Sequence, residues 1–104
     1  MEVAEWTETV TANNAAATVT HAAETVGAHY ITSISGSFSA AAIKLMTLKD
    51  GTTVIGNYHI HNADFIPFAK PIRITMGAIA ELSLAASGTG GVIGAVTMTG
   101  FTVG

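Results

Sequence analysis

The stretch that decides the fold runs from residue 43 to residue 61 and reads Ile-Lys-Leu-Met-Thr-Leu-Lys-Asp-Gly-Thr-Thr-Val-Ile-Gly-Asn-Tyr-His-Ile-His. At its centre, Asp50-Gly51 lies between two runs rich in Ile, Leu, Val and Tyr. Asp-Gly between apolar runs is a strong hairpin signal, because a type I′ turn needs positive φ at both central positions. Gly adopts positive φ freely, and Asp tolerates it better than most residues. The stretch therefore predicts two antiparallel strands, residues 43–49 and 52–61.

The length of the chain allows one domain, residues 1–104, and the composition indicates that this domain associates with other protein. Charged residues make up 11% of the chain and hydrophobic residues 49%, whereas an ordinary domain is about 25% charged. With so few charges, solubility is easier if much of the surface is buried against copies of the chain or another protein. We therefore expect self-association, and a neutral monomeric β domain is the alternative.

Composition disfavours several classes of partner and location. The chain has no cysteine, which excludes disulfides and thiolate metal sites. Its net charge is −3 with only four basic residues, so it lacks the basic stripe that a nucleic-acid groove needs. The acidic start, Met-Glu-Val-Ala-Glu-Trp, is unlike a signal peptide, and no apolar run approaches the roughly eighteen residues of a membrane span. We expect no nucleic-acid partner, no membrane and no signal peptide.

Short β-strands separated by turn signals are expected along the whole chain. Residues 15–24 and 79–86 could be helical on propensity, but the β-branched Thr18-Val19-Thr20 and the lack of a cap favour strands. The expected strands are residues 2–10, 16–20, 29–38, 43–49, 52–61, 65–68, 71–76, 79–86 and 92–103. Seven to nine short strands of this spacing predict an all-β fold, a single-domain antiparallel β-sandwich that is jelly-roll-like.

Alternation of apolar and polar residues predicts which side chains face the core. The expected inward sets are Tyr30, Ile34 and Phe38; Val54, Tyr58 and Ile60; and Ile72, Ile74 and Met76. His29 falls on the polar face of its strand.

Further features of the sequence predict the local structure of the backbone. Residues 1–14 form either an arm or an edge strand of the domain. Pro67 would remove a donor from the sheet, so it belongs at an edge or a bulge. Gly94 and Gly100 mark bulges or close backbone approaches.

His59-x-His61 is the one feature of the chain that looks like a reactive site. In a strand, residues i and i+2 share a face, so both imidazoles could reach one metal ion, as in the cupin metal site. The cupin pattern has Gly six residues before the first His, a Glu a few residues after the second, and a later His. Here Thr53 stands at the Gly position, Phe65 or Ile66 at the Glu position, and no His follows the pair.

A metal site needs three or four ligands, so we expect no metal and no other cofactor. A small cupin-like metal-binding protein using His59 and His61 is kept as an alternative. If the pair lay near a threefold axis, assembly would depend on pH.

No other residues form a recognisable catalytic set, and we expect a protein that is not an enzyme. There is no cysteine and no Gly-x-Ser-x-Gly nucleophile elbow. The seven acidic residues are scattered, with Asp50 assigned to the turn. Ser87-Gly-Thr-Gly-Gly91 lacks the Lys of a phosphate loop. A glycan-binding β-sandwich is the other alternative, although in a small domain most aromatic residues belong to the core; its candidates are Trp6, Tyr30, Phe38, Tyr58, Phe65, Phe68 and Phe101.

Several runs of the chain resemble a group of small proteins encoded by tailed phages and prophages. The shared character is a Gly/Ala/Thr/Ser-rich β domain with the same turns. The runs are residues 15–23, 29–39, 48–55, 61–62, 85–91 and 94–101. The resemblance implies a jelly-roll-like head decoration (capsid cement) protein, which sits as trimers on the outside of an icosahedral capsid. It implies no catalytic residues.

Together, these observations predict a structural virion protein that decorates and stabilises a bacteriophage capsid as a homotrimer. Its expected partners are copies of itself and the major capsid protein. Its expected location is the capsid surface of the virion, after synthesis in the host cytoplasm.

Overall fold

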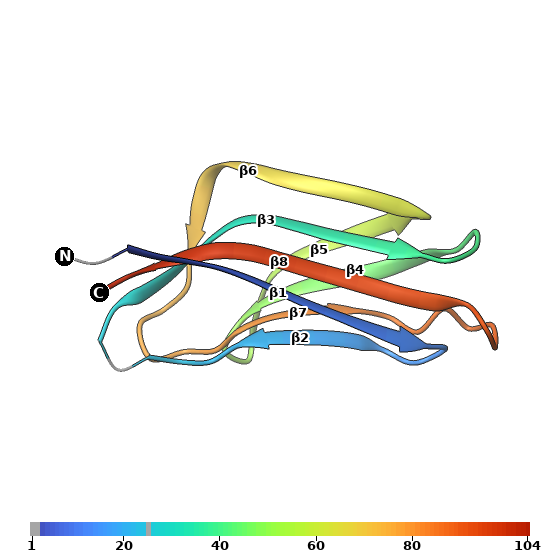
Figure 1. The fold of residues 1–104 in the computed structure, drawn as a ribbon, viewed down its shortest axis with the longest axis horizontal. Coiled ribbons are helices and arrows are strands. Elements are labelled where there is room, and N and C mark those ends of the chain that lie inside the picture. Colours follow the sequence, from blue (N-terminus) through green and yellow to red (C-terminus); the bar gives the residue numbers. More distant parts are fainter. Residues whose placement is uncertain (1–2, 25) are drawn as a thin grey trace.

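The computed structural model describes residues 3–24 and 26–104 and contains two four-stranded sheets packed face to face (Figure 1). One sheet has the strand order β1-β8-β3-β6 and the other β2-β7-β4-β5; they are called sheet A and sheet B. The strands are β1 (Val3–Asn13), β2 (Ala17–His21), β3 (Ala28–Phe38), β4 (Ile43–Asp50), β5 (Thr53–His61), β6 (Ala63–Arg73), β7 (Ala80–Leu84) and β8 (Ile93–Val103).

The strand order is that of a jelly roll. All paired strands are antiparallel, and every connection except β4–β5 crosses from one sheet to the other. Eight strands in two sheets with such connections make up the double Greek key of jelly-roll domains. The expected all-β, jelly-roll-like sandwich is therefore confirmed. The domain measures 45 × 23 × 20 Å, and both chain ends lie at one end of its long axis, because Val3 pairs with Val103 (Figure 1).

The core lies between the two sheets and is built from alternate residues of each strand. Along β7 and β8, buried side chains alternate with more exposed ones, which is the period of two expected for strands with one face inward. The Ala-rich segments that were expected as strands form β2 and β7, which confirms them. The largest fully buried side chains are Ile31, Ile34, Met46, Leu48, Ile60, Ile74, Leu82, Leu84, Val96 and Met98.

The predicted hairpin is confirmed, but its turn differs from the expected type. Asp50 pairs with Thr53 as the end of the β4–β5 ladder, so the two central residues are Gly51 and Thr52. Gly51 has a φ of 61°, whereas neither Asp50 nor Thr52 has positive φ. Positive φ at the first central position alone is the pattern of a type II′ turn. Asp50 instead accepts hydrogen bonds from the backbone N–H and hydroxyl of Thr75, at 3.1 and 2.7 Å.

Two β-bulges reverse part of the expected facing of side chains. In β3 the register shifts between Ile31 and Ser33, so His29 and Ile31 share the inward face with Ile34. Tyr30 therefore faces outward, contrary to expectation. In β5 the register shifts at Ile55, and Val54 lies opposite Lys49 with 48% of its surface exposed. One extra residue inverts the facing of everything beyond it.

β6 replaces the two strands expected over residues 65–76. It runs from Ala63 to Arg73 at the edge of sheet A and bends sharply near its end (Figure 1). Pro67 lies on this edge strand, as expected. Ile74 is buried, but Met76 is 52% exposed, because the strand has already ended and Met76 lies in the β6–β7 connection.

β1 is the edge strand of sheet A and pairs with β8 along its whole length. Gly100 of β8 faces inward at a close approach, as expected. A Cβ there would collide with the carbonyl oxygen of Tyr30 and lie 2.8 Å from the Trp6 ring. The described part of the chain has no helix of the length and hydropathy needed to cross a bilayer.

We expect Gly100→Ala to destabilise the domain by about 1–3 kcal/mol, the usual cost of overpacking a closed site. The matched control is Gly90→Ala, because a Cβ at Gly90 meets nothing within 4 Å. Urea unfolding followed by circular dichroism, at one protein concentration, measures both. Equal stability of the two variants would contradict the close approach at Gly100.

Candidate functional site

His59 and His61 lie on the outer face of sheet B, on the edge strand β5. Both are exposed, and they stand directly opposite Leu45 and Ile43 of β4. The two imidazoles therefore share a face, as the sequence indicates, and this face points away from the sandwich interior.

The other two histidines, His21 on sheet B and His29 on sheet A, lie at the opposite end of the sandwich. Across sheet B, His21 lies at the same level as Ala80, Asp50 and Thr53, which are paired in turn on β7, β4 and β5. His61 ends β5 eight residues after Thr53. At ~3.3 Å per residue, His61 therefore lies about 26 Å along the sheet from the level of His21. Asp64, the nearest acid in sequence, accepts a hydrogen bond from the His61 backbone N–H at 2.7 Å. Among the described residues, no three His, Asp or Glu side chains are placed to hold a metal ion.

The structure brings together five other residues near the chain ends: Trp6, Glu8, His21, His29 and Thr102. The rings of Trp6 and His21 are stacked, with centroids 3.9 Å apart and planes 9° from parallel. His29 meets the His21 ring edge-on at 4.7 Å. His21 Nδ1 lies 2.8 Å from a Glu8 carboxylate oxygen. This group, called the Trp–His cluster, joins β1, β2, β3 and β8.

Hydrogen bonds determine the protonation pattern of His29, which is only 3% exposed. Its Nε2 lies 2.7 Å from the Ala22 carbonyl oxygen, an acceptor only, so Nε2 carries the proton. Its Nδ1 lies 2.6 Å from Thr102 Oγ1 and accepts the hydroxyl proton. Thr102 Oγ1 in turn accepts the Trp6 Nε1–H at 3.0 Å. Each of these polar atoms is thus satisfied.

The Trp–His cluster is best explained as a structural network of hydrogen bonds and stacked rings that links the two sheets. Both nitrogens of His29 are committed to hydrogen bonds, which leaves neither ready to take a proton from a substrate. Within the described residues, no buried side-chain nitrogen or oxygen lacks a partner. Satisfied buried networks of this kind rigidify a core and specify one packing.

Sequence reasoning missed this cluster because its members come from four strands. The β3 bulge also placed His29 on the face opposite to the expected one. One signal was present: Trp6 and Glu8 stand at alternate positions of a strand, which predicts that Glu8 shares the inward face of an aromatic residue.

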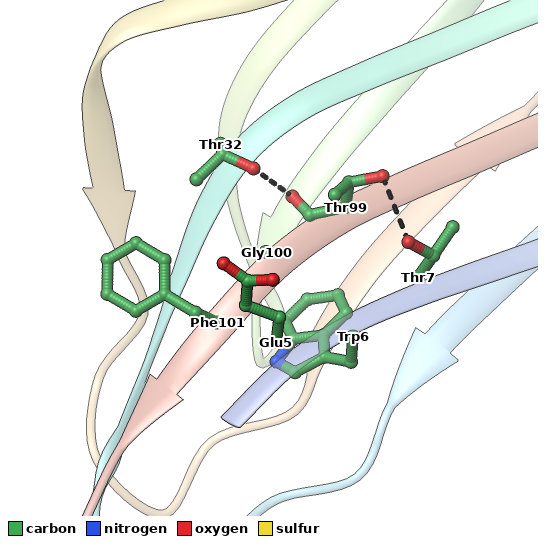
Figure 2. Close-up of a pocket in the computed structure, with 7 residues that line it drawn as sticks. All are labelled: Glu5, Trp6, Thr7, Thr32, Thr99, Gly100 and Phe101. Carbon is green, nitrogen blue, oxygen red and sulfur yellow. Dashed lines mark hydrogen bonds between the residues drawn. The ribbon is translucent and has the colours of Figure 1, made fainter. Parts of the chain in front are cut away.

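A shallow hollow of about 350 Å³ lies on the outer face of sheet A, beside Trp6 (Figure 2). It lies beside the bulge of β3, with Thr32 and the backbone of Gly100 among its lining residues. Thr32 donates a hydrogen bond to the Thr99 carbonyl oxygen at 3.0 Å. The other lining residues are Glu5, Trp6, Thr7, Thr99 and Phe101. The hollow offers one carboxylate, hydroxyls and an aromatic edge, but no basic side chain.

The aromatic residues divide between the core and the surface. Phe38 is buried, and Trp6, Tyr58 and Phe68 pack against the core. Tyr30 and Phe101 stack on each other on the outer face of sheet A, with centroids 5.1 Å apart. Phe65 is 67% exposed on the same sheet.

The domain also exposes many large apolar side chains. Of the ten found among residues 3–24 and 26–104, six lie at the end that holds the two chain termini, here called the terminal end. These six are Val3, Val26, Val54, Ile55, Met76 and Ile79; the other four are Ile43, Leu45, Phe65 and Ile93.

Comparison of the chain with protein-family models, with curated proteins and with solved structures found no match.

Removing the hydroxyl of Thr102 tests the Trp–His cluster. Thr102→Val keeps the shape of the side chain but leaves the Trp6 N–H and His29 Nδ1 without their partner. We expect a loss of about 1–3 kcal/mol in the free energy of unfolding. The control is Thr97→Val on the outward face of the same strand, where we expect a change within about 0.5 kcal/mol. Urea unfolding measures both, and equal losses would contradict a special role for Thr102.

Proposed function

We propose that the protein is a structural component of a phage virion, which decorates and stabilises the capsid exterior as a homotrimer. The observation that carries this proposal is the surface of the jelly roll, where large apolar side chains lie exposed on a domain with few charges. The proposal includes no catalytic role, metal or cofactor.

The exposed apolar side chains support a protein that works inside an assembly. Soluble monomers rarely expose large contiguous apolar patches, and such patches commonly mark interaction sites. Here ten large apolar side chains are at least 38% exposed among the described residues, while charged residues are 11% of the chain. The jelly-roll order of the strands agrees with the fold that the resemblance to phage decoration proteins implies.

The terminal end is the surface that we assign to the major capsid protein. It carries six of the ten exposed side chains on the starts of β1 and β5 and on the β2–β3 and β6–β7 connections. The cross-section of the domain there is at most 23 × 20 Å, well below the roughly 800 Å² that each partner gives to a stable interface. One copy would bind weakly, whereas a trimer engaging three lattice sites at once gains affinity through its multivalency.

A glycan-binding module is the second candidate, and the hollow beside Trp6 favours it. Phe101 and the hydroxyls of Thr7, Thr32 and Thr99 line this hollow, and sugars are bound by aromatic faces together with polar groups. A glycan array distinguishes the two functions. Specific binding that is lost in Phe101→Ala would favour the glycan module.

Charged substitutions at the terminal end test the capsid assignment. In Val26→Asp/Met76→Asp, two apolar contacts become carboxylates that would have to lose their hydration at the interface. We expect this variant to form trimers but to lose at least about tenfold in binding to capsids that lack the chain. Ile93→Asp, at the opposite end of the domain, is the control and should bind normally.

Co-sedimentation with the capsids gives the binding, and light scattering gives the mass of each variant. Equal binding of the two variants would contradict the assignment of the terminal end. Absence of the chain from purified virions would end the capsid proposal itself.

A further inference from the structure

The edge strand β5 lacks the Pro and charged residues that often protect a sheet edge. It is the last strand of sheet B, and its nine residues include no Pro and no Lys, Arg, Asp or Glu. The edge strand β6 of sheet A contains Pro67, Lys70 and Pro71. Natural proteins use Pro and Lys at edges to prevent unwanted strand pairing. The edge of β5 is therefore open to another chain, although the Ile55 bulge interrupts it.

The outer face next to this edge is apolar and carries the two exposed imidazoles. Ile43 and Leu45 of β4 are 64% and 38% exposed, and they stand opposite His61 and His59 of β5. A hollow of about 340 Å³ follows along the same face, with Leu45, Val54 and Ala85 among its lining residues. A side chain from a neighbouring molecule can enter there without displacing the core.

This face carries no net fixed charge, so two copies of it can meet without repulsion. The fixed charges on the outer face of β4, β5 and β7 are Lys49 and Glu81, which are paired at 3.6 Å. Elsewhere the chain has a net charge of −3, which opposes association of identical molecules. Like charges facing each other across an interface cost affinity, so a neutral face favours a second copy.

We infer that the outer face of β4 and β5, with the open edge of β5, is the surface through which copies of this chain associate. The occupant is a second copy of this chain, and in a closed trimer each copy presents this face to the next copy around the threefold axis. This inference rests on the homotrimer of the proposed function and locates its interface. The area supports a lateral contact: the side of the domain measures 45 × 20 Å or more, room for the roughly 800 Å² that each partner buries in a stable interface. The terminal end does not offer this area.

Leu45→Glu tests the inference, and Phe65→Glu is its matched control. Both place the same carboxylate on an exposed apolar position, but Phe65 lies on the outer face of sheet A. Burying an unpaired carboxylate is costly, so we expect Leu45→Glu to lower the association constant at least about 100-fold. Phe65→Glu should remain trimeric. Light scattering coupled to size exclusion gives the mass, and circular dichroism checks that each variant is folded.

His59→Glu serves if Leu45→Glu does not fold, because His59 is exposed on β5 beside Leu45. A trimer that survives either folded variant, or that Phe65→Glu dissociates, overturns the inference and leaves the capsid proposal standing. A wild-type chain that is monomeric at micromolar concentration overturns the inference and the homotrimer together.

Discussion

The pairing of β8 between β1 and β3 is the constraint on which the rest of the structure depends. β8 pairs with β1 over eleven residues and with β3 across nearly the same length, so the last strand of the chain completes the sheet that the first strand begins. This position requires small inward residues: Gly100 lies beneath Trp6 and the Tyr30 carbonyl group, and Gly94 beside Phe38. Thr102, on the same face of β8, accepts a hydrogen bond from the Trp6 Nε1–H and donates its hydroxyl proton to His29 Nδ1.

The Trp–His cluster shows how a small domain can close an open end without a disulfide. Two sheets that twist relative to each other separate at their corners, where apolar side chains no longer fill the gap. Here Trp6, His21 and His29 fill one such corner, and the hydrogen bonds of His29 tie the β2–β3 connection to β8. A polar residue is favourable in this corner because the β2–β3 connection places the Ala22 carbonyl group there, and His29 Nε2–H donates a hydrogen bond to it.

The surface divides into regions with different chemistry. The outer face of sheet A carries cross-strand hydroxyl pairs such as Thr9 and Thr97, which remain compatible with water. The outer corner of β4 and β5 and the terminal end carry most of the exposed apolar side chains. The long side of the domain has room for a stable contact between copies. The narrow terminal end has room only for a weak contact, which a trimer would make three times. These two regions would serve as the two kinds of interface that the proposed capsid-binding trimer requires.

The amino-acid sequence by itself determined the elements that depend on local chemistry. The β-branched runs, the glycines and the Asp50-Gly51 hairpin predicted an all-β sandwich, the strands β2 and β7, and close approaches at Gly94 and Gly100. The tertiary structure decided what depends on register and on contacts between distant strands. The bulges in β3 and β5 reversed the facing of Tyr30, His29 and Val54, because a bulge forms only when a strand must match its neighbours. The Trp–His cluster, and the wide separation of His21 and His29 from His59 and His61, were set by which strands lie side by side. Residue spacing along the chain cannot predict which strands lie side by side, because strand pairing depends on how all the strands pack around one shared core.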